Sequence, residues 1–511
     1  MVERREQGPL RRLLDRELFT EFLRKRIAVL ALVFAIEAAL FFLVANVPFL
    51  PGEQARYSQS INATRNAVSG LPIPNQIGTI FWNNEQIAVQ DLSPLQGPIY
   101  FLLTSYNTAR GIEVLALMAG ATSNSVLLQL YSLPHTWIET SAYALGITEA
   151  VYIIGTVLRR KTPDFDWDRL ERELRYVPPV MVMVVALLTV AAVFEVLEAH
   201  TGGNAEFLFW VPTVLLAILA ARAVMRRPVA QVPAVPAASA AAVEPAPPGF
   251  EGLRRDVESR TRDDRPTSAA WLALPAGELI LEYSVIVYAF YALYLIIKPT
   301  LAGNPPPTVL QLVPFGEPLY TVLTYMAFAG LMVFLYRLIQ GRNQHFAREH
   351  AFLEDLLRQS TARAAQVGKL DEFQARLVPA RQTLDEIRKK EGRRDPLLWT
   401  VSTFFIGILI LFDYYFLSKD FFRHEEREDR FLDQLAFAAS AIGVNLRTQR
   451  RARPLPNRSF ALYAILSAVT AYTFWFYWNY RLIQDQNQHF NSEWELEDGL
   501  LTAVRGDATQ T

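Results

Sequence analysis

The chain has 511 residues, of which 51% are apolar and 20% charged, and its net charge is −1. This length exceeds that of one ordinary domain, and the near-zero net charge excludes the strongly basic composition typical of nucleic-acid-binding proteins. The absence of cysteine excludes disulfides, thiolate metal sites and cysteine nucleophiles.

The N-terminal region combines an amphipathic segment with an apolar run. Leu10, Leu14, Leu18 and Phe22 recur at helical spacing, which predicts an interfacial helix over residues 1–26. The apolar run from residue 27 to residue 49 has the length of about 20 residues that a membrane span requires. Cations at residues 24–26 precede this span directly, so we expect a cytoplasmic N-terminus.

Further apolar runs predict a first membrane module over residues 27–227. We expect three spans between Ile80 and Leu158, followed by Val177 to Leu197 and Phe207 to Val224. Residues 228–270 are rich in alanine and proline and are typical of a linker.

A second module is predicted over residues 271–502, with a disordered tail at 503–511. Its four expected spans are Leu279 to Ile297, Leu319 to Ile339, Leu397 to Phe416 and Phe460 to Ile483. Between the second and the third, residues 343–391 have a helical polar pattern and predict a soluble helical hairpin. The fold class is therefore all-α, with about ten transmembrane helices in two modules.

The sidedness of residues 417–459 is contradictory. Counting spans places this segment outside the cell, yet its cations favour the cytoplasmic side. These cations include Arg447, Arg450, Arg451 and Arg453.

The second module contains an internal repeat. Tyr336 to Gln340 recurs as Tyr480 to Gln484, and Asn343 to Phe346 recurs as Asn487 to Phe490, both at an offset of 144 residues (480 − 336). A looser third copy contains Phe421, His424, Glu425 and Glu428. Such repeats indicate duplicated structural units.

Two interpretations of the repeat remain open. The repeated histidines form a paired site related by pseudo-symmetry, or each copy marks a helix leaving the membrane, with aromatic and basic residues at the interface. We favour the second interpretation and expect neither a metal nor another cofactor. The repeated exit motif comprises Tyr336, Arg337, Asn343, His345, Tyr480, Arg481, Asn487 and His489.

The segment from residue 80 to residue 158 carries a motif series. Asn83-Asn84 follows Ile80-Phe81, Asn107 comes further on, and Leu133-Pro134-His135 is followed by Glu139. This series resembles the stage II sporulation protein M family of integral membrane proteins. That family has an Asn-Asn pair, an Asn-Gly pair and a Leu-Pro-His-Gly-x-x-Glu sequence; here Thr108 and Thr136 replace the two glycines.

The resemblance covers residues 27–224 and does not extend to the second module. It implies a polytopic, all-helical protein that has no catalytic activity of its own. It also implies a scaffold or transport-associated role within a larger membrane complex.

Ionisable residues inside the predicted spans form a candidate polar network. Glu37, Arg110, Glu113, His135 and Glu139 belong to it, and His135 and Glu139 share one helical face. Intramembrane ionisable groups are costly and often functional. The alternatives are ties between helices, an ion or substrate path, and a catalytic site; we favour the first.

We therefore predict a non-enzymatic scaffold that assembles a larger membrane complex. The alternative is a transporter or permease subunit with a polar path through the first module. Expected partners are the lipid bilayer, other proteins bound through residues 343–391, and further copies of the chain, but not nucleic acid. The expected location is the plasma membrane, as a multi-pass protein.

Overall fold

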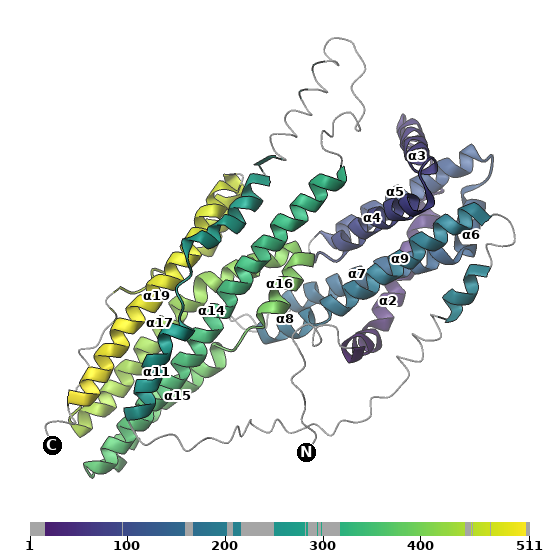
Figure 1. Ribbon diagram of the computed structural model, residues 1–511. Helices are drawn as coiled ribbons and strands as arrows, with labels where there is room; N and C mark the ends of the chain where they lie inside the picture. The colour runs from purple at the N-terminus through teal and green to yellow at the C-terminus, as the bar shows by residue number, and fades with distance from the viewer. Residues whose placement is uncertain are drawn as a thin grey trace. The chain divides into compact units, whose positions relative to one another are not determined.

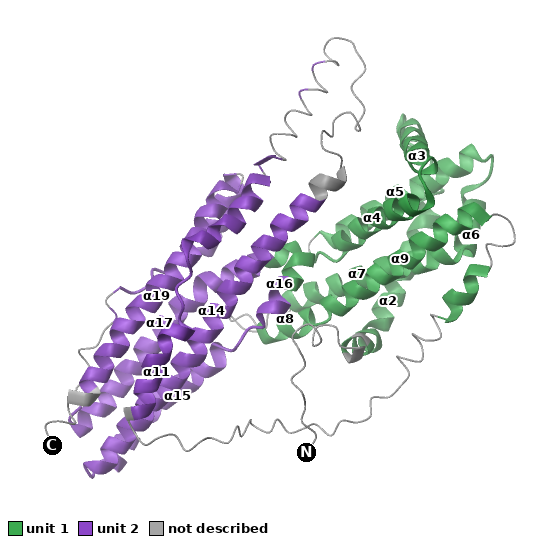
Figure 2. Ribbon diagram, in the orientation of Figure 1, with its two compact units in different colours: residues 1–236, 401–409 green, residues 237–400, 410–511 purple. Residues whose placement is uncertain are grey.

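The computed structural model is built from helices (Figure 1). Clustering of contacts divides it into two units, coloured separately in Figure 2. Unit 1 comprises residues 1–236 and 401–409, and unit 2 comprises residues 237–400 and 410–511. The residues that the structure describes are 16–94, 96–158, 167–201, 208–215, 250–281, 283, 284, 294, 298, 317–444, 451, 453–470 and 472–506.

Unit 1 is a bundle of helices of unequal length. Buried apolar side chains, including Phe22, Ala142, Val180 and Leu188, pack α2, α7 and α9 together. The helices are α2 (Arg16–Val44), α3 (Glu53–Ser69), α4 (Ile73–Asp91), α5 (Gly97–Met118), α6 (Ser123–Ser132), α7 (Pro134–Leu158), α8 (Trp167–Leu174) and α9 (Val177–Thr201).

Helix α2 corrects the expected start of the chain. It runs without a break from Arg16 to Val44, so residues 16–26 extend the first apolar helix and do not form a separate interfacial helix. Residues 1–15 of the predicted interfacial helix lie outside the described residues.

Helices α5 and α6 form a broken pair. Only the two helices together are long and apolar enough to form one membrane span. The chain bends by 110° at the break between them. Thr122 caps α6 by accepting a hydrogen bond from the amide of Ser125 at 3.2 Å. Broken helices of this kind line cavities in many membrane proteins, because the freed backbone groups need polar surroundings.

Unit 2 contains long helices that lie side by side (Figure 1). Pro379 lies inside α15 and does not end this helix. A positive φ of 71° at Gly368 provides the turn between α14 and α15. The principal helices are α11 (Phe250–Asp263), α14 (Glu317–Gln366), α15 (Leu370–Lys390), α16 (Pro396–Phe405), α17 (Ile410–Ala439), α18 (Phe460–Val469) and α19 (Thr473–Gly506).

One apolar core joins five of these helices. Leu253 of α11, Phe352 of α14, Phe373 of α15, Phe431 of α17 and Leu496 of α19 are all buried in it. We call this assembly the distal bundle. Helix α11 was expected to be part of the linker, but it packs on α14 and belongs to this bundle.

The number of spans is smaller than expected among the described residues. Four helices are long and apolar enough to cross a membrane, or five if the bent pair counts as one span. These are Thr20–Val44, Pro134–Leu158, Trp167–Thr201 and Val322–Gln366. The expected spans at 397–416 and 460–483 are broken after the short apolar helices α16 and α18. Most of the expected spans at 207–224 and 279–297 lies outside the described residues.

Candidate functional site

Unit 1 encloses a polar cavity of about 360 Å³ to which every helix from α2 to α7 contributes. Helix α9 adds Glu195. Among the described lining residues, the carboxylates are Glu37, Glu139 and Glu195, and the only basic group is the imidazole of His135. The cavity is therefore rich in carboxyl groups and lies inside a bundle that contains three of the candidate spans.

Glu37 is the most deeply buried of these carboxylates. Its exposed fraction is 3%, and its Oε2 atom has no hydrogen-bond partner among the described residues. Glu139 accepts a hydrogen bond from the Tyr143 hydroxyl at 2.7 Å. A carboxylate that is buried in a span without a partner is costly unless a proton or a cation neutralises it.

The predicted polar network is divided in the structure. Arg110 pairs with Glu113 at 2.5 Å, and also with Glu53 at 3.0 Å, a partner that the sequence did not suggest. His135 does not pair with Glu139; its Nδ1 atom contacts Glu198 of α9 instead. Glu37 and Glu139 remain together as cavity-lining residues. The predicted network therefore consists of two separate parts: an ion cluster around Arg110 and a group of residues that line the cavity.

The motif residues of the first module divide similarly. Asn83, Asn84, His135 and Glu139 line the cavity. Asn107 lies outside this lining and accepts a hydrogen bond from the Tyr57 hydroxyl at 2.6 Å, while Pro134 begins α7. Four of the six motif residues therefore face one space, although they come from only two helices.

The repeated histidines of unit 2 meet inside the protein. His345 of α14 and His489 of α19 are both fully buried, and their Nε2 atoms lie 2.8 Å apart. His424 of α17, from the third copy, joins them, and one ring nitrogen from each of the three lies within 4.8 Å of the others. These imidazoles therefore lie among the helices and are not exposed at the surface.

A carboxylate faces the Nδ1 atom of each histidine. Asp264 lies 3.0 Å from His345, Glu391 lies 2.8 Å from His424, and Glu425 lies 2.8 Å from His489. Asp264 directly follows α11 and Glu391 directly follows α15, so short connections between helices position both. Burial lowers the pKa of His489 well below its usual range, and neighbouring His345 and Arg451 add to the effect.

A second cluster lies one helical turn further along. Glu349, Glu493 and Glu497 offer carboxylate oxygens within 4.8 Å of one another. Glu349, Glu428 and Glu493 each follow a clustered histidine by four residues, which places them on the same helix faces. Arg451 pairs with Glu428 and Glu493, and Arg348 pairs with Glu497 at 2.5 Å.

The other motif residues of unit 2 bind backbone groups or lie nearer the surface. Asn487 accepts from the Thr267 amide at 2.8 Å and donates to the Thr267 carbonyl at 2.9 Å. Asn343 makes the equivalent pair of bonds with Arg394. Arg481 pairs with Asp485, while Tyr336, Arg337 and Tyr480 are partly or fully exposed.

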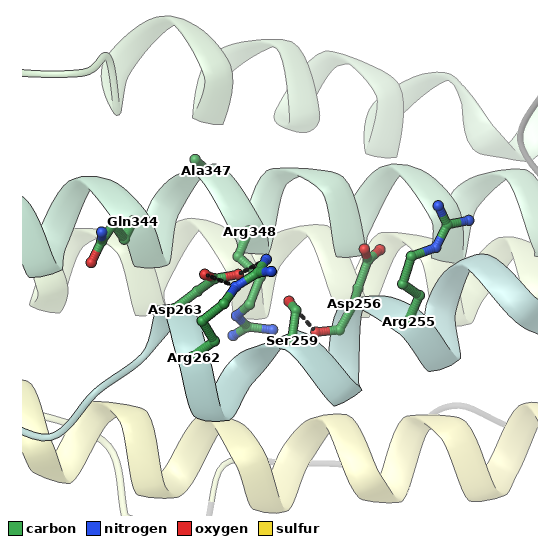
Figure 3. Close-up of a pocket in the computed structure, with 8 residues that line it drawn as sticks. All are labelled: Arg255, Asp256, Ser259, Arg262, Asp263, Gln344, Ala347 and Arg348. Atoms are coloured by element: carbon green, nitrogen blue, oxygen red, sulfur yellow. Dashed lines mark hydrogen bonds and ion pairs between the residues drawn. The ribbon is translucent and has the colours of Figure 1, made fainter. Parts of the chain in front are cut away.

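A cleft of about 420 Å³ lies between α11 and α14 in unit 2 (Figure 3). Its charges largely pair with nearby carboxylates. Arg262 contacts Asp263 at 3.0 Å, and Arg348 contacts Asp264 at 2.7 Å, which connects the cleft to the carboxylate that holds His345.

Sequence reasoning missed Glu195, Glu198, Asp264, Glu349 and Glu391. The four-residue spacing from histidine to glutamate in all three repeat copies was a usable signal for Glu349. No comparable pattern identified Asp264 or Glu391, because their connection to the histidines exists only after the helices pack.

Comparisons with known proteins gave no match to any family model, curated protein or solved structure. The resemblance of residues 27–224 to the stage II sporulation protein M family therefore stays a prediction.

Proposed function

We propose that the chain is a permease-type membrane protein that admits a small cationic solute into the carboxylate-lined cavity of unit 1. The single observation that carries this proposal is the cavity itself, with Glu37, Glu139 and Glu195 on its wall. Its volume of about 360 Å³ lies within the range of small-molecule sites. The absence of arginine and lysine from the described lining favours a cation over an anion.

The helix arrangement supports the same proposal. Helices α5 and α6 form a bent pair, and residues of both helices line the cavity. Discontinuous helices beside a buried polar site are typical of transport proteins. A scaffold whose polar residues only tie helices together would place Glu37 and Glu139 against basic partners.

The scaffold hypothesis is supported by buried ion pairs elsewhere in unit 1. Arg26 contacts Glu173 and Glu149, and Arg110 contacts Glu53 and Glu113, so both buried arginines act as ties between segments. These ties would be compatible with either function. The accessibility of the cavity therefore discriminates the two hypotheses.

The chain contains no cysteine, which permits a clean accessibility experiment. Thr140→Cys places a thiol on the cavity wall, whereas Thr148→Cys is a matched control. Both threonines lie on α7, are buried, and donate to the carbonyl four residues earlier, but Thr148 does not line the cavity. Intact membrane vesicles are treated with impermeant thiosulfonate reagents that carry either a trimethylammonium or a sulfonate group.

We expect the cationic reagent to modify Thr140→Cys at least about tenfold faster than the anionic reagent, because a cleft of one charge concentrates counter-ions. Glu139→Gln in the same background should reduce this preference. Equal and slow modification of both cysteines by both reagents would mean a closed, dry interior and would favour the scaffold.

A further inference from the structure

We propose that His345, His424 and His489 of unit 2 form a binding site for one divalent transition-metal ion of the zinc class. The site is separate from the cavity of unit 1, and the inference does not depend on the permease function. It also departs from the sequence-based expectation that the repeated histidines mark helix exits.

The first step concerns the tautomers of the imidazoles. Each Nδ1 atom faces a carboxylate, which accepts a hydrogen bond and so retains the proton on Nδ1. Each Nε2 atom then presents a lone pair. This is the arrangement by which carboxylates orient and strengthen histidine ligands at metal centres.

The second step concerns where these lone pairs point. The Nε2 atoms of His345 and His489 are 2.8 Å apart, a distance at which two lone pairs repel unless the nitrogens share a proton or bind one cation. The Nε2 atom of His424 is buried and has no hydrogen-bond partner among the described residues. Three Zn–N bonds of about 2.0–2.1 Å place ligand nitrogens about 3.3 Å apart in a tetrahedron. That separation lies between the 2.8 Å contact and the 4.8 Å limit of the group.

The third step concerns charge. Seven carboxylates of this network are buried, whereas four arginines among the described residues contact them: Arg348 and Arg451, which are buried, and Arg260 and Arg427, which are partly exposed. Buried charges require compensation, and a divalent cation would supply two positive charges at the centre. The seven residues are Asp264, Glu349, Glu391, Glu425, Glu428, Glu493 and Glu497.

Glu428 is a candidate for the fourth ligand. Its Oε2 atom lies 3.7 Å from the Nε2 atom of His424 and contacts Arg451, while its Oε1 atom is buried and has no hydrogen-bond partner among the described residues. Three imidazoles and one carboxylate suit zinc, nickel or copper(II) better than calcium or magnesium, which prefer oxygen ligands. Four protein ligands in a fully buried position are typical of a closed, structural metal site.

The repeat gives this site its architecture. Each of the three copies contributes one histidine from one long helix, so the metal would connect α14, α17 and α19. Duplication explains why the same residue type appears at equivalent positions, and only all three copies together complete the site. The competing explanation is a metal-free cluster in which the imidazoles share a proton.

The full-length protein, purified in detergent, is stripped with a chelator and then titrated with Zn²⁺ or Co²⁺. We expect one ion per chain by elemental analysis, and the intense visible bands of four-coordinate Co²⁺. Zn²⁺ should displace Co²⁺ and remove these bands. A wild-type protein that binds less than a tenth of an ion per chain, or gives only the weak spectrum of hydrated Co²⁺, would overturn the proposal.

Three variants assign the ligands. His424→Gln should lose the ion, and Asp264→Asn should weaken binding by about 10–100-fold through His345, as at other metal sites with altered supporting carboxylates. His350→Gln is the matched control, because His350 also contacts Glu391, at 3.2 Å, but is not in the cluster. Equal metal binding by His424→Gln and His350→Gln would contradict the assignment. If His424→Gln does not fold, the wild-type titration and Asp264→Asn still decide the question.

Discussion

Arg110 illustrates how buried arginines stabilise unit 1. Its guanidinium contacts Glu53 at 3.0 Å and Glu113 at 2.5 Å, and it lies 3.9 Å from the ring centroid of Phe49. Removing one carboxylate from such a cluster weakens the compensation of a buried guanidinium charge and so destabilises the folded state. Glu53 is therefore the residue that attaches the start of α3 to α5.

Glu53 should make this attachment pH-dependent. The Leu50 amide first, then the Tyr106 hydroxyl and Arg110, lower the pKa of Glu53 from 4.5 to about 2. A carboxyl group whose pKa is lowered in the folded protein stabilises it above the unfolded pKa, and the contribution disappears as pH falls toward the folded pKa. We expect Glu53→Gln to lower the thermal unfolding midpoint clearly at pH 6 but only slightly at pH 2.5. An unchanged difference at the two pH values would contradict this role.

Individual pairings were the least predictable feature from sequence. Arg110 and Glu113 were both members of the predicted network, and they pair in the structure. The spacing of His135 and Glu139 suggested a second pair, yet His135 contacts Glu198, which is 63 residues away. Helical periodicity identifies neighbours within one helix, but the partner on another helix depends on packing angles that the sequence pattern does not specify.

At the scale of elements, the close approach of α4 and α5 depends on one glycine. A Cβ atom on Gly97 would lie 2.1 Å from the backbone oxygen of Asp91, so an alanine there must shift the chain. We expect Gly97→Ala to destabilise the protein by about 1–3 kcal/mol, as overpacking usually does. Thermal unfolding in detergent measures this change.

Gly78→Ala provides the comparison for that experiment. Gly78 lies inside α4 and has open space around it, so alanine should be neutral or stabilise by up to about 1 kcal/mol through its helix propensity. If both substitutions change the unfolding midpoint equally, the proposed close contact at Gly97 does not control stability.

The repeats show how far elements could be predicted. Identical residues in two copies identified α14 and α19 as related, and the loose third copy contains His424. The expected spans at 397–416 and 460–483 were not confirmed, because short apolar helices of ten residues precede the breaks. A hydropathy average over the whole run does not detect such a break.

At the scale of the whole molecule, the distal bundle resolves the contradiction over residues 417–459. Helices α15 and α17 share one apolar core with parts of α14 and α19. Helix segments that pack around one core lie on the same side of the membrane, so counting 397–416 and 460–483 as full crossings on either side of α17 was misleading. We propose that this side is cytoplasmic, in agreement with the cations at residues 447–453.

Labelling of single cysteines tests this arrangement. Gln374→Cys on α15 and Ser440→Cys after α17 replace exposed residues of the distal bundle. An impermeant maleimide should label both from the same side of sealed vesicles. Labelling from opposite sides would mean that the helices of the bundle do not assemble as described.

The all-helical fold and the presence of several membrane helices were predictable, because length and hydropathy control both. The cavity was predictable only in part. Glu37, His135 and Glu139 were identified as costly intramembrane groups, whereas Glu195 was hidden in a long apolar helix. The three-histidine cluster required the structure, because its members are separated by up to 144 residues.

Uptake of radiolabelled tetramethylammonium by proteoliposomes tests the permease proposal most directly. We expect saturable uptake with the wild-type chain, at least tenfold slower uptake with Glu139→Gln, and near-normal uptake with Glu21→Gln, a partly exposed carboxylate of α2 outside the cavity lining. Wild-type uptake no faster than that of protein-free vesicles would contradict the account, and so would an equal loss of uptake in both variants.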